Sequence, residues 1–136
     1  MGLIENIQKV FSKHNETQEN HTDETLRTHY YKSTKDKVMK EIEAMLNKES
    51  GFSISSISSE HGEIIVNVKK GKTALMVITV IMVRPFRTAV DFSIATESFL
   101  FTDFGYSRNL ARELYKELNS RLTLVGTGLG DSLTRS

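Results

Sequence analysis

The stretch that decides the fold is Thr73–Val83, with the sequence Thr-Ala-Leu-Met-Val-Ile-Thr-Val-Ile-Met-Val. It is the only long apolar run in the chain. Successive side chains of a strand point to opposite faces, and from Ala74 onwards both faces are apolar except at Thr79. The valine, isoleucine and threonine content favours a strand over a helix. A transmembrane helix needs about 20 apolar residues, so we expect a central strand that does not cross a membrane.

A strand that is apolar on both faces must be covered on both sides. We expect the two main helices to cover the first face. Three covers are open for the second face: the N-terminal helix, a second subunit in a homodimer, or an apolar ligand around which the sheet curves. The sequence alone does not separate them.

The segments around this strand predict hairpins and two helices. Short turn signals between neighbouring strands are typical of an antiparallel meander. We therefore predict an α+β fold, a two-layer sandwich with a sheet of about five antiparallel strands in the order β-α-β-β-β-β-α. The other predicted strands are Leu26–Lys32, Phe52–Ser59, Ile64–Val68 and Thr88–Glu97, and the helices run from Ser33 to Lys48 and from Tyr106 to Leu122.

Four local signals refine these boundaries. Ser33–Asp36 has the Ser-x-x-Asp form of a capping box at the start of the first helix, and Gly51 stands where a helix C-cap glycine is expected. The phase of the apolar residues slips between Ile54 and Ile57, which predicts a bulge or an edge position. Gly62 supplies the positive backbone angle of the turn that follows.

The two ends of the chain differ in composition from its middle. Leu3, Ile7, Val10 and Phe11 form the apolar stripe of a short N-terminal helix, and Ser12–Thr25 is a polar linker. We expect residues 1–25 to be an appendage, residues 26–122 to be one α+β domain, and residues 123–136 to be a flexible tail.

Composition excludes several classes of function. The chain has 18 Lys and Arg against 17 Asp and Glu, a net charge of +1, which gives no electrostatic case for nucleic acid. Two short basic clusters, Lys69-Lys70-x-Lys72 and Arg84-x-x-Arg87, are too small to indicate a nucleic-acid site. No cysteine is present, which excludes disulfides and thiolate chemistry. Met1–Phe11 lacks the pattern of a secretory signal, so we expect a cytoplasmic protein with no integral membrane segment.

The metal and nucleotide motifs in the sequence are weak. The histidines have no metal-binding spacing, and we expect no metal and no cofactor; they are His14, His21, His29 and His61. The glycines from Gly126 to Gly130 follow a helix, whereas a phosphate loop leads into one. Asp103-Phe104-Gly105 matches a kinase triplet by letter, but the other kinase motifs are missing. We interpret Asp103 as a cap of the last helix and Gly105 as its tight entry.

A set of turn and cap residues resembles those of an uncharacterised bacterial family of small cytosolic proteins, classed as a domain of unknown function. They are Tyr30-Tyr31, Asp36-Lys37-Val38, Gly51-Phe52, Glu60-His61-Gly62-Glu63-Ile64 and Asp103-Phe104-Gly105. The resemblance runs from about Leu26 to Leu122. It departs from the family at Gly71–Leu75, which lacks the proline that often precedes this strand. The resemblance implies these domain boundaries and a cytosolic setting, and it carries no activity, cofactor or catalytic residue.

Our hypothesis from the sequence is a non-enzymatic binding or interaction module, a homodimer that could hold a small apolar ligand between the sheet and the C-terminal helix. The candidate ligand-binding residues are Tyr30, Met76, Asp91, Phe92 and Phe104. The alternative is an enzyme that uses Asp91, Glu97 or Asp103 as general acid or base.

Overall fold

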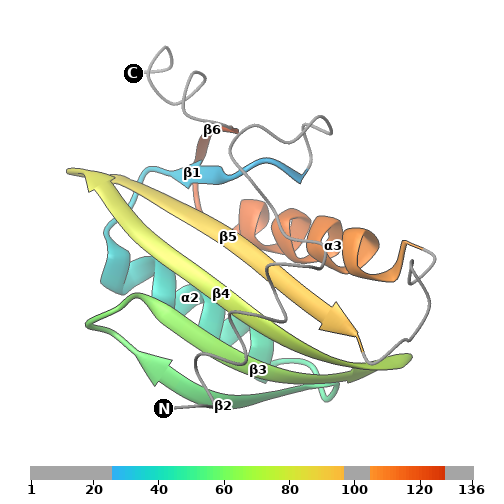
Figure 1. Ribbon diagram of the computed structural model, residues 1–136. Coiled ribbons are helices and arrows are strands. Elements are labelled where there is room, and N and C mark those ends of the chain that lie inside the picture. The colour runs from blue at the N-terminus through green and yellow to red at the C-terminus, as the bar shows by residue number, and fades with distance from the viewer. Residues whose placement is uncertain (1–25, 97–104, 128–136) are drawn as a thin grey trace.

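The computed structural model describes residues 26–96 and 105–127. The expected N-terminal helix and the residues Glu97, Asp103 and Phe104 lie outside these ranges. The elements follow one another as β1 (His29–Tyr31), α2 (Lys35–Asn47), β2 (Phe52–Ser58), β3 (Glu63–Lys70), β4 (Lys72–Arg84), β5 (Arg87–Thr96), α3 (Tyr106–Arg121) and β6 (Leu124–Thr127). The strands form one antiparallel sheet in the order β2-β3-β4-β5-β1-β6 (Figure 1). The predicted α+β class is confirmed, and the described sheet has six strands.

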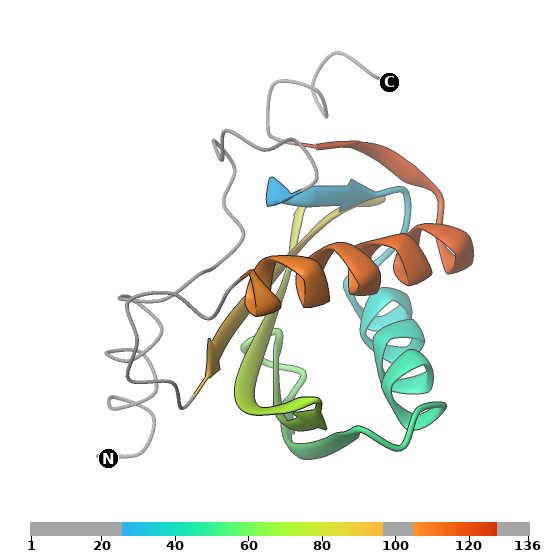
Figure 2. The same ribbon diagram turned by 90° about the vertical axis from the view of Figure 1, so that its right-hand side faces the viewer.

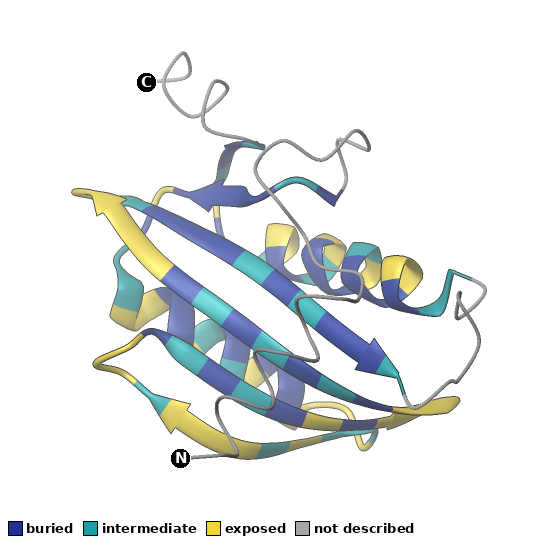
Figure 3. Cartoon of the chain, in the orientation of Figure 1, coloured by how far each residue is buried: buried dark blue, intermediate teal, exposed yellow. Residues whose placement is uncertain are grey.

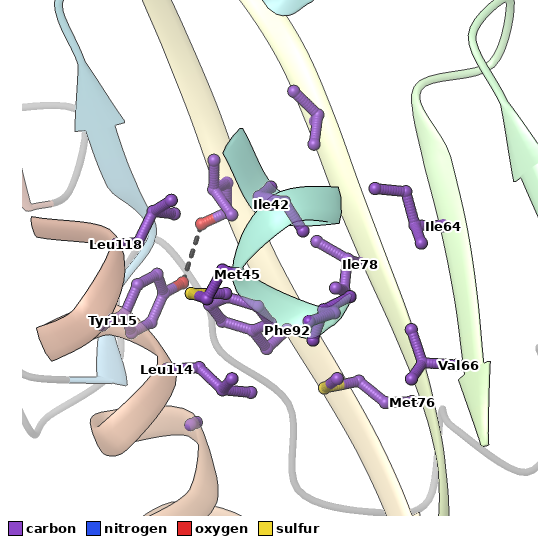
Figure 4. Close-up of a cluster of buried hydrophobic side chains, with 14 of the residues drawn as sticks. Ile42, Met45, Ile64, Val66, Met76, Ile78, Phe92, Leu114, Tyr115 and Leu118 are labelled. Carbon is purple, nitrogen blue, oxygen red and sulfur yellow. Dashed lines mark hydrogen bonds between the residues drawn. The ribbon is translucent and has the colours of Figure 1, made fainter. Parts of the chain in front are cut away.

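Both helices lie on the same face of the sheet (Figure 2). The apolar side chains of α2 and α3 pack in one core with alternate residues of β4: Ala74, Met76, Ile78 and Val80. Phe92 of β5 lies opposite Ile78 and joins this core, as the close-up in Figure 4 shows. The expected central strand, with one face on the two helices, is therefore confirmed.

The opposite side of β4 differs from this core. Leu75, Val77 and Thr79 are half-buried and Ile81 is exposed, so the strand alternates between dark blue and teal in Figure 3. No helix of the described residues lies on this side of the sheet, and we call it the helix-free face. The apolar pattern on both faces of Thr73–Val83 thus corresponds to one face covered by α2 and α3 and one face that no described helix covers.

The strand β6 was not predicted. Leu124–Thr127 was assigned to the tail, but it pairs with β1, with Tyr30 opposite Gly126. A stretch as short as Leu-Val-Gly-Thr has little strand preference of its own. It becomes a strand because α3 ends at Arg121 beside the open edge of β1, and because Leu122 and Leu124 pack against the core.

Two predicted caps are also wrong. The N-cap of α2 is Thr34, whose hydroxyl accepts a hydrogen bond from the Lys37 amide at 3.3 Å, one residue after the predicted Ser33. The C-cap is Lys48 in a right-handed conformation, so Gly51 does not end the helix. A Cβ atom on Gly51 would lie 3.2 Å from Cβ of Lys70, and the glycine therefore serves close packing between β2 and β3.

Three other local predictions are confirmed. The register of β2 on β3 shifts between Ile54 and Ser56, and β2 is an edge strand. Gly62 has a φ of 67° in the turn between β2 and β3. Gly105 has a φ of 80°, in agreement with the predicted tight entry, whereas the N-cap of α3 is Gly105 itself and the predicted cap Asp103 lies outside the described residues.

Candidate functional site

The helix-free face carries a polar group where β1 meets β5. The Thr28 hydroxyl donates a hydrogen bond to Oδ1 of Asp91 at 2.7 Å. Tyr30 lies on the same side of the sheet, opposite Ala89, and is only 2% exposed. The bond joins the residue before β1 to β5 on this side of the sheet.

The four described candidates among the five predicted ligand-binding residues lie on two different sides of the sheet. Met76 and Phe92 point into the core between the sheet and the helices, and both are fully buried. Tyr30 and Asp91 belong to the opposite, helix-free face. Phe104 lies outside the described residues. One strand cannot present neighbouring residues such as Asp91 and Phe92 to the same side, and this alternation separates the set.

The space between the sheet and α3 is filled by side chains. The rings of Phe92 and Tyr115 meet edge to face with their centroids 4.7 Å apart. The Tyr115 hydroxyl donates to the Val90 carbonyl at 2.7 Å, which is the dashed line in Figure 4. These contacts are those of a packed core.

The far end of the β4–β5 hairpin exposes a group of large apolar side chains. Ile81, Met82, Val83 and Phe86 are 52%, 46%, 46% and 59% exposed, and we call them the apolar tip. Figure 3 shows this end of β4 in yellow. Among the described residues, the one other exposed large apolar side chain is Ile57.

The apolar tip is exposed because the hairpin extends past its neighbour. Pairing of β3 with β4 ends at Glu63 and Thr79, and the next backbone bond on that side runs from the Val80 amide to the Gly62 carbonyl at 2.7 Å. Residues beyond Val80 therefore have no β3 beside them. The turn itself is tight, since the backbone of Phe86 has a φ of 56°, which residues other than glycine rarely adopt.

A buried histidine lies on the helix side of β1. The His29 ring stacks on the Tyr115 ring with the centroids 3.6 Å apart and the planes at 7°. Its Nδ1 donates to the Arg27 carbonyl at 2.8 Å. Burial lowers the pKa of His29 from 6.5 to about 4, so the ring is neutral at pH 7. Nearby, the Tyr31 hydroxyl donates to Oδ1 of Asn119 at 2.6 Å, and burial raises the pKa of Tyr31.

His29 is not predicted from the sequence to be part of the core, although strand alternation gives one signal. Strand alternation puts His29 on the same side as Tyr31, but their partners on α3, Tyr115 and Asn119, lie more than 80 residues along the chain. The result is a packed aromatic cluster. It has no opening toward a substrate in the described contacts.

We predict that His29 makes the fold sensitive to acid. The folded pKa of about 4 lies below the unfolded value of 6.5, so the unfolded chain binds more protons between these values. Stability is therefore lost as the pH falls from about 6.5 to about 4. At about 1.4 kcal/mol per pKa unit the ceiling is about 3 kcal/mol, and relaxation around the charged ring leaves on the order of 2 kcal/mol.

Urea unfolding at several pH values measures this effect. His29→Phe should remove on the order of 2 kcal/mol of the pH dependence between pH 7 and pH 4. His61→Gln is the control, since His61 is exposed in the turn after β2, where its Nδ1 lies 2.9 Å from the Ser58 hydroxyl. Equal pH profiles for wild type and His29→Phe would show that His29 does not titrate as described.

Metal and membrane features were also sought in the described ranges 26–96 and 105–127. No group of three histidine, aspartate or glutamate side chains there is placed to hold a metal ion. Neither described helix has the length and apolar character needed to span a bilayer. No protein-family model matches the chain, and neither does any curated protein.

Proposed function

We propose that the protein is a non-enzymatic binding module that self-associates through the helix-free face of its sheet. The observation that carries the proposal is the apolar tip: Ile81 ends the helix-free row of β4, and Met82, Val83 and Phe86 expose further apolar surface beside it. Soluble domains rarely expose contiguous apolar patches of this kind unless the patch is an interaction site. The half-buried Leu75 and Val77 continue the patch along β4 toward the middle of the sheet.

A second copy of the chain is the occupant that the surface favours. Two sheets pack face to face at about 10 Å through alternating apolar residues, which is the pattern of β4 on this side. An identical face is its own complement in a two-fold dimer. The net charge of +1 means that two copies do not strongly repel each other.

The other hypotheses receive less support from the geometry. An apolar ligand between the sheet and α3 would have to displace the Phe92–Tyr115 contact. An enzyme built on Asp91 rests on one carboxylate, whose bond with Thr28 serves equally well to join β1 to β5. The resemblance to the uncharacterised bacterial family stays a prediction, and so does a cytoplasmic location.

Sedimentation velocity of the full chain over a range of concentrations tests the proposal. We expect a dimer for the wild type. The double variant Ile81→Lys/Phe86→Ser should weaken it at least about tenfold, because apolar anchors at an interface centre contribute most of the affinity. Thermal unfolding of both proteins shows whether the variant still folds.

The matched control is Ile57→Ser, which removes an exposed apolar side chain on the edge strand β2. It should leave the dimer unchanged. A wild type that stays monomeric at every concentration, or an equal loss in the control, would refute self-association through this face. Native mass spectrometry of the purified protein reports whether a small molecule or another protein occupies the face instead.

A further inference from the structure

A separate hollow lies at the other end of the sheet. Its volume is about 340 Å³, within the range of about 300–1,000 Å³ that is usual for small-molecule sites. It is formed where β2, β3 and β4 lie side by side, near the start of β4. At about 3.3 Å per residue, Thr73 and the apolar tip are more than about 20 Å apart along the strand. The hollow therefore lies on the helix-free face but far from the apolar tip.

The hollow exists because its walls are built from small side chains. β2 and the residues before it contribute Ser50, Gly51 and Ser53, and β4 contributes Thr73 and Ala74. The strands are still tied together, since the Lys69 amide donates to the Gly51 carbonyl at 2.8 Å. Small residues on a regular sheet leave a depression that large ones would fill.

Polar groups converge on this depression. Ser53 lies opposite Asn67, and Lys69 lies opposite Thr73. Strand alternation puts all four on the helix-free face, because Val68 and Ala74 between them face the core. These four residues thus place two hydroxyls, an amide and an ammonium group in adjacent register positions.

The three lysines of the β3–β4 turn are not equivalent. Nζ of Lys70 is 2.8 Å from Oε2 of Glu49, and this hydrogen bond raises the pKa of Lys70. Nζ of Lys72 lies 5.9 Å from the centre of the Tyr106 ring. Within the described ranges no carboxylate pairs with Lys69, the one lysine of the turn that lines the hollow.

We infer that this hollow binds a small molecule through an oxyanion, a carboxylate or a phosphate. Lys69 supplies the positive charge and a charge-assisted hydrogen bond. Ser53, Asn67 and Thr73 supply neutral donors around it. Phe52, Val68 and Ala74 also line the hollow, but their side chains pack on the core side of the sheet, so the groups that face a ligand are the polar ones.

Amide NMR spectra of the full chain test the inference, with sodium phosphate and sodium acetate as probes and sodium chloride at matched ionic strength as the reference. We expect saturable shifts at Ser53, Asn67, Lys69 and Thr73 with phosphate or acetate. Tighter binding of phosphate would indicate a phosphorylated ligand, and tighter binding of acetate a carboxylate. Equal shifts in chloride would overturn the inference.

Two variants separate a built site from general basic charge. Lys69→Gln should weaken binding about tenfold or more, because it removes one charge-assisted hydrogen bond. Lys70→Gln removes the same charge from the same turn, but from the lysine held by Glu49, and it should change affinity less than about threefold. Equal weakening by both variants would mean that the anions are attracted to the positive charge of the turn in general, and it would overturn the inference of a specific site at Lys69. The amide spectra also show whether each variant is folded.

Discussion

Replacing Phe92 by alanine is expected to lower the free energy of unfolding by about 3–5 kcal/mol. Phe92 is fully buried, lies opposite Ile78 on β4, and meets the Tyr115 ring edge to face at 4.7 Å. Removing the ring leaves a cavity between the sheet and α3, where three elements hold the surrounding side chains in place (Figure 4). The close-packed side chains around the site can fill this cavity only in part, so most of the cost of the cavity remains.

Urea unfolding followed by circular dichroism measures this loss. Ile57→Ala is the control, since it shortens an exposed apolar side chain on the edge strand β2 and should alter stability by less than about 0.5 kcal/mol. A loss of less than about 1 kcal/mol for Phe92→Ala would contradict a packed core at this position. It would restore the interpretation of Phe92 as the wall of a ligand cavity.

Replacing Gly62 by alanine is expected to cost about 3 kcal/mol. The φ of 67° places the residue in the left-handed region, which costs an alanine about 1–2 kcal/mol. A Cβ atom there would lie 2.1 Å from the Val80 carbonyl oxygen, so the turn would have to move. That movement breaks the bond from the Val80 amide to the Gly62 carbonyl, which contributes about 1 kcal/mol more.

The control for this substitution is Gly71→Ala in the turn between β3 and β4. Gly71 has a φ of 84°, but the nearest atom to an added Cβ is Cε1 of Tyr106 at 3.9 Å. Only the backbone strain of about 1–2 kcal/mol applies there. Equal losses for the two variants in thermal unfolding would show that the close approach to Val80 is relieved without cost.

The predictions on Gly62 and the apolar tip concern the same place in the sheet. The bond between Gly62 and Val80 is the point at which β3 stops following β4. A turn that shifts there would change how much of the hairpin extends beyond the sheet. Measuring both the stability and the dimer affinity of Gly62→Ala therefore tests whether the turn at Gly62 controls the exposure of the apolar tip.

Several features follow from the sequence alone because they depend on neighbouring residues. The core-facing set of β4 follows from strand alternation within Thr73–Val83, and the positive φ of Gly62 and Gly105 follows from the demands of tight turns. Short connections made the meander from β2 to β5 antiparallel. The start of α3 at Tyr106 agrees with the prediction, and its end at Arg121 differs by one residue.

The tertiary structure alone decided the features that depend on contacts between distant residues. β6 exists because the chain after α3 reaches the open edge of β1, and its four residues have no strong preference of their own. His29 is buried because Tyr115, far along the chain, stacks on it. The hollow beside Lys69 depends on small residues of three strands meeting in register. The apolar run Thr73–Val83 is therefore a core strand along most of its length. Its end is exposed because β3 stops at Glu63 while β4 continues.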